Sequence, residues 1–268
     1  MKSQKSEARS RKSEKRKSKK VSVFCLLFFV FCLLSLLACS SQSSPPEQKS
    51  PEQKSEEQHY NPHNLNASPI IISLLPVESA GAMYERFVPL KYYLENILRR
   101  PVTIKVAKDY EDAIHEIGSG KVHMAFLDPA AYCEVRARYK NKVVPIVRPV
   151  GKGGATSRSV LTVKDKSGIA NVADVKGKRL ALGSKQSSFS YLIPLAMLND
   201  VSLRVNDFAG VDFLQQEDRV ALSVLIGDHD VGALSESVAV KYAKDGLKII
   251  KKSEAIPSFV LCASDTLP

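Results

Sequence analysis

From residue 70 onward, short apolar runs of strand length alternate with segments whose apolar residues recur at helical spacing. Residues 70–75 form such a run, and residues 90–98 after it carry leucine, tyrosine and isoleucine at intervals of three or four. We expect Pro89 in the first turn of this helix, where the missing N–H costs nothing. An alternation of this kind is typical of an α/β fold built from layers.

Glycine divides this alternating region into two sets. The densest glycine cluster of the chain lies at residues 151–154. The strand-like runs lie at 102–106, 124–127 and 143–147 before the cluster, and at 159–163, 179–182, 231–234, 247–250 and 259–263 after it. We expect two α/β lobes around a hinged cleft, with crossings at 151–157 and 250–257. Lobe one would hold residues 68–150 plus 251–268, and lobe two residues 151–250.

The first 67 residues differ in composition from the rest. Residues 1–20 carry +8 of the formal net charge of +11, and an entirely apolar or small-residue run follows at 21–38. This pattern is typical of a signal peptide. An uncleaved transmembrane helix is the alternative, because 18 residues reach about 27 Å. Both interpretations, the signal peptide and the transmembrane helix, place the following chain outside the cytoplasm. Residues 39–67 are polar and contain a duplicated Pro-Glu-Gln-Lys-Ser, so we expect a flexible tether.

The end of the apolar run, Leu36-Leu37-Ala38-Cys39, resembles a bacterial lipobox. The resemblance implies that residues 1–38 are removed and that the thiol of Cys39 receives a lipid anchor. The remaining mild positive charge suits a small anionic ligand. It does not suit nucleic acid, which needs clustered basic side chains.

No pattern in the chain predicts catalysis, a metal site or a cofactor. His-Glu-x-x-His, Gly-x-Ser-x-Gly, Cys-x-x-Cys and the dinucleotide-binding glycine pattern are all missing from the sequence. The chain is therefore not expected to be an enzyme. After the signal peptide and Cys39, the remaining cysteines are Cys133 and Cys262. We expect both side chains in the apolar core, and a disulfide between them is the open alternative.

A run of hydroxyl side chains joins a predicted strand to a predicted helix at residues 183–194. Free N–H groups at a helix N-terminus bind oxyanions, and Ser187 and Ser188 would assist them. The alternative is that one of these serines is an ordinary N-cap.

Several segments together resemble the phosphonate/phosphate/phosphite-binding proteins of ABC importers, which have the type II periplasmic-binding-protein fold. The segments are Asp-Tyr-Glu-Asp at 109–112, residues 120–132 with Ala-Phe-Leu-Asp-Pro-Ala-Ala-Tyr, Ala-Asp-Val-Lys-Gly-Lys-Arg at 173–179, residues 187–194, and Ile-Pro at 256–257. The resemblance spans residues 70–268 and implies a permease and an ATPase as partners.

The resemblance also implies site residues. Tyr110 matches a tyrosine that donates to a ligand oxygen, and Ser187 and Ser188 match the first two residues of a Ser-Thr-Ser turn. A tyrosine of some members falls on Ser157, and a histidine falls on Glu217. A carboxylate that binds a ligand amine falls on Glu236, or on Ser237 after a shift of one residue, and Asp128 stands where the family more often has glycine.

Glu217 would repel an anion, so a zwitterionic ligand reconciles these residues better than a simple oxyanion. The expectation is a monomeric, lipid-anchored solute-binding protein that captures a phosphonate/phosphate-like or zwitterionic molecule for an ABC importer. One alternative is a sensory or scaffold lipoprotein of the same fold that signals to a membrane kinase. A second is an extracytoplasmic enzyme related to the binding proteins, for which Cys133 would be the candidate residue near the cleft edge. Resembling proteins continue with a further helix, so either the chain is truncated or lobe one is smaller here.

Overall fold

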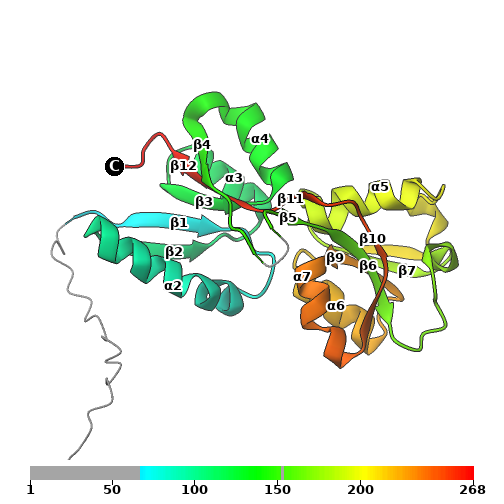
Figure 1. The fold of residues 1–268 in the computed structure, drawn as a ribbon. Coiled ribbons are helices and arrows are strands. Elements are labelled where there is room, and N and C mark those ends of the chain that lie inside the picture. Colours follow the sequence, from blue (N-terminus) through cyan, green and yellow to red (C-terminus); the bar gives the residue numbers. More distant parts are fainter. Residues whose placement is uncertain (1–66, 152–153) are drawn as a thin grey trace, which may run out of the picture. The chain divides into compact units, whose positions relative to one another are not determined.

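The computed structural model describes residues 67–151 and 154–268. They belong to one compact unit, residues 58–268, and form two lobes, each with a five-stranded mixed sheet and helices against it (Figure 1). The signal peptide, nearly all of the tether and the lipobox with Cys39 lie outside the described residues.

Lobe one contains four strands and three helices before the first crossing, and one strand after the second. The elements are β1 (Ile70–Leu74), α2 (Ala80–Leu98), β2 (Val102–Val106), α3 (Tyr110–Gly118), β3 (Met124–Leu127), α4 (Pro129–Tyr139), the short 3-10 turn η1 (Lys140–Lys142), β4 (Val143–Val147) and β12 (Val260–Ser264). The strand order is β2-β1-β3-β12-β4. β1 is parallel to β2 and β3, whereas β12 is antiparallel to β3 and β4.

Right-handed connections determine where the helices lie. The chain moves outward from β1 to β2 and then back across β1 to β3, so α2 and α3 cover opposite faces of the sheet. A side-chain oxygen caps the start of each helix: Ser79 accepts from Ala82 N, Asp109 from Asp112 N, and Asp128 from Ala131 N at 2.9 Å. These caps fix the helices at the carboxyl ends of β1, β2 and β3.

The position of Pro89 differs from the sequence-based expectation. α2 begins at Ala80, so Pro89 lies in the middle of a 19-residue helix and not in its first turn. The expected start was wrong because only the apolar spacing after Pro89 was used. The N-cap of Ser79, together with the burial of Met83 and Phe87 against the sheet, stabilises the earlier turns.

Lobe two has a mixed sheet with the strand order β10-β6-β9-β7-β8. Its elements are β6 (Ser159–Lys164), η2 (Val172–Val175), β7 (Arg179–Leu182), the π-helical turn η3 (Ser188–Leu192), α5 (Ile193–Asn199), η4 (Val205–Asp207), β8 (Gly210–Phe213), α6 (Glu217–Ile226), β9 (Val231–Ser235), α7 (Glu236–Lys241), η5 (Ala243–Asp245) and β10 (Leu247–Lys252). The edge strand β8 had no counterpart in the strand-like runs predicted from the sequence. The two lobes are connected by β5 (Thr156–Ser157) and β11 (Ile256–Pro257), which pair antiparallel.

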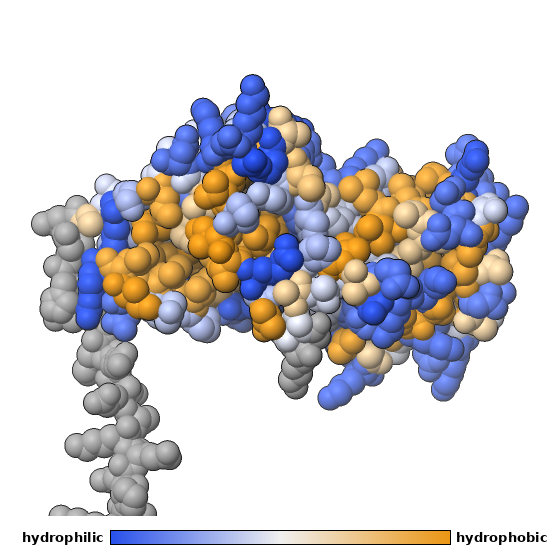
Figure 2. All heavy atoms as spheres, turned by 45° about the horizontal axis from the view of Figure 1, so that its top comes forward, coloured by the Kyte–Doolittle hydropathy of each residue, from blue (hydrophilic) through white to orange (hydrophobic). Residues whose placement is uncertain are grey.

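Each lobe has its own apolar core, and the described cysteines are free. Cys262 is buried in β12, as expected, but Cys133 is exposed on α4, so its predicted core position was wrong. α4 places Ala131 and Val135 against the sheet and thereby turns Cys133 outward. Figure 2 shows that apolar side chains also gather on the surface of lobe one. Exposed apolar side chains of this lobe include Ile97 of α2 and Val147 of β4.

Candidate ligand site

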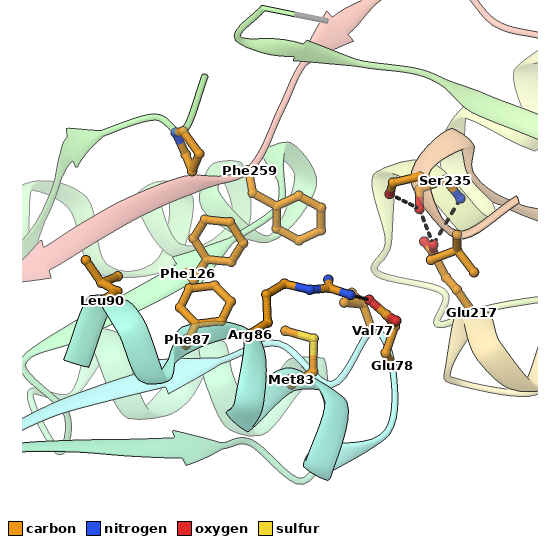
Figure 3. Close-up of a pocket in the computed structure, with 13 residues that line it drawn as sticks. Val77, Glu78, Met83, Arg86, Phe87, Leu90, Phe126, Glu217, Ser235 and Phe259 are labelled. Carbon is orange, nitrogen blue, oxygen red and sulfur yellow. Dashed lines mark hydrogen bonds and ion pairs between the residues drawn. The ribbon is translucent and has the colours of Figure 1, made fainter. Parts of the chain in front are cut away.

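A cavity of about 350 Å³ lies between the two lobes (Figure 3). Its lining residues are Val77, Glu78, Met83, Arg86, Phe87, Leu90, Phe126, Pro149, Glu217, Ser235, Ser237, Val238 and Phe259. Lobe one contributes nearly all of the apolar lining, from the start of α2, from β3 and from the chain before β12. Lobe two contributes the carboxylate of Glu217, two hydroxyls and Val238, and lobe one adds the charged Glu78 and Arg86. The cavity therefore has an apolar side formed by the rings of lobe one and a polar side.

Phenylalanine side chains form the apolar side. The ring of Phe126 stands edge-on to that of Phe87, with centroids 4.9 Å apart, and stacks on that of Phe259 at 5.0 Å. Phe259 in turn stacks on the fully buried Phe189 of lobe two at 5.7 Å. The row of rings therefore continues from one lobe into the other, and it presents an apolar surface against which the carbon part of a ligand can pack.

Glu217 is the central polar group of the opposite side. It begins α6, is only 2% exposed, and its Oε2 accepts hydrogen bonds from Ser235 N at 3.0 Å and from Ser235 Oγ. The pKa of Glu217 is raised to about 7, chiefly by burial; the hydrogen bonds from Ser235 oppose this shift, and the negative charges of Asp128 and Glu78 add to it. Its carboxyl group therefore exchanges a proton near neutral pH.

An ion-pair network crosses from lobe one to lobe two beside this cavity. Glu78, between β1 and α2, pairs with Arg86 of lobe one and with Lys241 of lobe two, whose Nζ lies 2.8 Å from Oε2. The same Nζ lies 2.9 Å from Oδ1 of Asp218. Asp218 also accepts from the hydroxyl of Tyr242 at 3.0 Å and, across the lobes, weakly from the backbone N–H of Ser79. We name Glu78, Lys241 and Asp218 the interlobe triad.

Three of the residues expected to bind an oxyanion lie together. Tyr110 at the start of α3 and Ser187 and Ser188 at the start of η3 are all buried. Burial raises the pKa of Tyr110 well above its ordinary value, and the neighbouring charge of Asp128 acts in the same direction. None of the three belongs to the lining of the cavity described above.

The position of the two serines depends on the turn after β7. Gly183 ends this strand, and a Cβ atom there would lie 2.1 Å from Oγ of Ser190, so only glycine allows η3 to pack this closely. Ser187 caps the helical segment by accepting from Ser190 N at 3.2 Å. This is the N-cap role that the sequence analysis left open for one of the serines.

Asp128 faces the serines from lobe one. Its Oδ2 accepts from Ser188 N at 2.7 Å, and Oγ of Ser188 accepts from Ala130 N at 2.8 Å. Burial raises the pKa of Asp128 to about 6, although its hydrogen bonds with Ala131, Ser187 and Ser188 act in the opposite direction. The lobes are therefore joined at this point by two hydrogen bonds of good geometry.

The remaining expected site residues lie elsewhere. Ser157 lies in β5 and pairs with Ile256 in the connection between the lobes. Glu236 begins α7, and its carboxylate pairs with Nζ of Lys252. Ser237, the alternative to Glu236, does line the cavity, and its hydroxyl lies 3.1 Å from that of Ser235.

Sequence reasoning missed the apolar side of the cavity and the interlobe triad. Phe126 lies in the apolar, strand-like run 124–127, so a core role accounted for it fully. Lys241 had no sequence signal, because its two partners lie 163 and 23 residues away. Within residues 67–151 and 154–268, we found no cluster of three or more side chains that would hold a metal ion, and no helix there has the length and apolarity of a membrane span.

Comparison with known proteins identifies the architecture. The protein family described as "ABC transporter, phosphonate, periplasmic substrate-binding protein" matches residues 72–268. A binding-protein component of an ABC phosphonate transporter from Pseudomonas aeruginosa is 21% identical, with a TM-score of 0.68 over 75% of this chain and 70% of the other. PhnD1 from Prochlorococcus marinus, solved with methylphosphonate, is 18% identical, with a TM-score of 0.69 over 77% and 78%.

A third solved structure, a Xanthomonas citri protein bound to ATP, is 21% identical, with a TM-score of 0.58 over 75% of this chain and 78% of the other. Identities this low establish a common fold and leave the ligand open. They confirm the expected two-lobe type II periplasmic-binding-protein fold. Together with the match over residues 72–268, they place the chain in the family of periplasmic substrate-binding proteins of ABC phosphonate transporters, which bind solutes outside the cytoplasm and are not enzymes.

Proposed function

We propose that this protein is a lipid-anchored receptor that binds an amine-bearing small molecule between its lobes and delivers it to the permease and ATPase of an ABC importer. The carboxyl group of Glu217 at the cavity surface is the observation that supports this choice of ligand. The solute-binding role follows from membership of the family.

The charge of the cavity favours an amine over a simple oxyanion. An anion about 4 Å from an ionised Glu217 would be repelled by about 1 kcal/mol in a water-filled cleft and by about 4 kcal/mol at an effective dielectric constant near 20. A protonated amine gains a similar amount instead. Arg86 also lines the cavity, but its guanidinium already pairs with Glu78. Of the two ligand types expected from the sequence, only the zwitterionic one carries the amine that Glu217 favours.

The apolar side of the cavity determines the rest of the ligand. Phe87, Phe126 and Phe259 offer ring surface opposite Glu217, and the volume of about 350 Å³ lies at the lower end of the range for small-molecule sites. A ligand with a short apolar body and an amine would bury the body against the rings and direct the amine toward Glu217. Each buried CH₂ group would contribute about 0.8 kcal/mol.

Closure of the lobes would couple binding to transport. Glu217 and Ser235 belong to lobe two and the phenylalanine side to lobe one, so the ligand touches both halves only when the lobes are closed. A ligand of this kind favours the closed state, which the permease would recognise.

A matched pair of ligands tests the proposal. Phenethylamine and 2-phenylethanol share the apolar body and differ in the charged amine. Calorimetry of the whole mature protein should give at least tenfold tighter binding of the amine at pH 8. The preference should weaken as the pH falls below 7, because protonation removes the charge of Glu217.

The Glu217→Gln variant should lose the preference for the amine, because the amide keeps a hydrogen-bond acceptor for Ser235 but has no charge. The control is Glu85→Gln, which removes an exposed carboxylate of α2 outside the cavity lining. Equal binding of the amine and the alcohol to the wild-type protein would contradict the proposed ligand class. Tight phosphate binding that does not depend on Glu217 would favour an oxyanion ligand.

The anchor and the natural ligand are tested in the host cell. Growth of the host with a tagged fatty acid should label the wild type and leave Cys39→Ser unlabelled, because only the thiol can accept the lipid. Native mass spectrometry of the protein purified from that host should reveal a co-purified molecule with an amine. A wild-type protein without the label would exclude lipid attachment at this residue.

A further inference from the structure

A carboxylate of the chain lies at the helix N-terminus where the sequence analysis expected a ligand oxygen. Ser188 N, the first N–H of the helical segment formed by η3 and α5, donates to Oδ2 of Asp128 at 2.7 Å. The N–H groups at a helix N-terminus lack partners within the helix and attract negative charge. In this protein the negative charge comes from Asp128 of the other lobe.

The contacts of Asp128 are suited to hold its carboxylate in this position. Oδ1 caps α4 through Ala131 N at 2.9 Å, while Oδ2 reaches Ser188 N. Asp128 has no solvent exposure, and Ser188 has 4%. The hydroxyls of Ser187 and Ser188 and the ring of Tyr110 lie against the same carboxylate. Neutral donors from both lobes thus surround one carboxylate of the protein.

From this arrangement we infer that Asp128 is a specificity-determining residue, because its carboxylate occupies the oxyanion position between the lobes and excludes phosphate- and phosphonate-type ligands from it. The inference rests on the proposed function in one respect: the space between the lobes is where solutes bind. It makes the Ser187–Ser188 turn a structural contact between the lobes and leaves the cavity beside Glu217 to the ligand.

Two physical effects exclude the anion. The side chain of Asp128 already uses the N–H of Ser188, so a ligand oxygen would find no free donor there. Its charge would also repel a second anion in a region closed to water, where Coulomb interactions are stronger than in solution. The negative charge of Glu217 also raises the pKa of Tyr110, so a second carboxyl group acts on this cluster.

The test replaces Asp128 by residues that keep a helix cap but free the donor. Serine is as good an N-cap as aspartate, and glycine costs only a few tenths of a kcal/mol more. Asp128→Ser and Asp128→Gly therefore have independent chances to fold, which circular dichroism and thermal unfolding would verify. Asp109→Ser is the matched control, because Asp109 caps α3 in the same lobe through Asp112 N at 2.8 Å.

The probes are inorganic phosphate and methylphosphonate, titrated by calorimetry into the mature protein at pH 8. The wild type and Asp109→Ser should bind both anions weakly. Asp128→Ser, or Asp128→Gly if only that variant folds, should bind phosphate or methylphosphonate at least ten times more tightly than the wild type does. Such a gain has no explanation in a purely structural role of Asp128.

Two results would overturn the inference. The first is equal anion affinity in the wild type and in a folded Asp128 variant. The second is tight phosphate binding by the wild type, because the oxyanion position would then be open. The outcome is separate from that for phenethylamine: a gain of phosphate binding in Asp128→Ser supports the role of Asp128 even if the wild type binds no amine.

Discussion

Replacing Lys241 by methionine should destabilise the closed protein more than an ordinary surface ion pair would predict. The ammonium group lies 2.8 Å from Glu78 and 2.9 Å from Asp218, whose side chains are 1% and 11% exposed, whereas that of Lys241 is 43% exposed. Burial lowers the pKa of Lys241, but the hydrogen bonds and charges of the two carboxylates outweigh this effect and raise it overall. The lysine therefore compensates two carboxylates that water can reach only poorly.

The expected loss lies between two limits. Exposed ion pairs contribute about 0–1 kcal/mol, and removing one partner of a fully buried pair costs about 3–5 kcal/mol. The carboxylates match the second case and the half-exposed ammonium matches the first. We therefore expect Lys241→Met to lower the free energy of unfolding by about 1–3 kcal/mol. Glu78→Gln in the same background should recover part of this loss, because it removes a buried carboxylate that would otherwise be left with Arg86 as its remaining ion-pair partner.

Urea unfolding at pH 7.5, with the ligand removed, measures both effects. The control is Lys252→Met, because the pair of Lys252 with Glu236 is 51% and 29% exposed and stays within lobe two. This control should lose at most about 1 kcal/mol. An equal loss in the two methionine variants would refute the reasoning, and so would an absence of coupling between Lys241 and Glu78 in the double-mutant cycle.

Further predictions concern the buried acid and two glycines. Burial raises the folded-state pKa of Glu217 from its ordinary value near 4.5 to about 7, so its contribution to stability is fully present below about 4.5 and is lost as the pH rises through 7. The stability of the wild type relative to Glu217→Gln should therefore fall over this window, by at most about 1.4 kcal/mol per pH unit, in urea unfolding at several pH values. Gly183→Ala should lower the melting temperature strongly and displace Ser187, because the new Cβ would meet Ser190 Oγ at 2.1 Å; an unchanged melting temperature would contradict this packing. Gly118→Ala should also lower the melting temperature, because its Cβ would lie 2.2 Å from the ring of Tyr139. The folded Gly118→Ala protein should still bind the ligand.

Local sequence patterns predicted most of the framework. The apolar run at residues 70–75 and the alternation at 102–106 correspond to β1 and β2, and the glycine cluster at 151–154 precedes β5 in the connection between the lobes. These features depend on residues close together in the chain. α2 shows the limit of this approach, because its first turns are stabilised by the Ser79 cap and by burial against a sheet whose strands are distant in sequence.

The candidate site was predictable only in part. The strand-to-helix turn at Ser187 and Ser188 could be located, because a hydroxyl run between two elements has a physical reason. Its partner could not be identified from sequence: the contact between Asp128 and Ser188 joins residues 60 positions apart and exists only when the lobes are closed. The phenylalanine side escaped prediction for a related reason, because a ring that lines a cavity has the same sequence pattern as a ring in the core.

The buried carboxyl groups of Asp128 and Glu217 suggest how an empty receptor differs from an occupied one. Contacts that need no ligand, those of Asp128 with Ser188 and of Lys241 with Glu78, already join the lobes. Closure alone would therefore be a poor signal that a ligand is bound. A ligand shifts the equilibrium between the open and the closed state only by the difference between its affinities for these two states. In the proposed function, Glu217 supplies that difference. Its charge is unfavourable in the empty closed cavity, and a bound amine both stabilises the charge and contacts the rings of the opposite lobe. The closed state would then gain stability from an amine ligand above all near and above pH 7, where Glu217 is ionised, and this pH dependence links the recognition of the ligand to the closure that a transporter can detect.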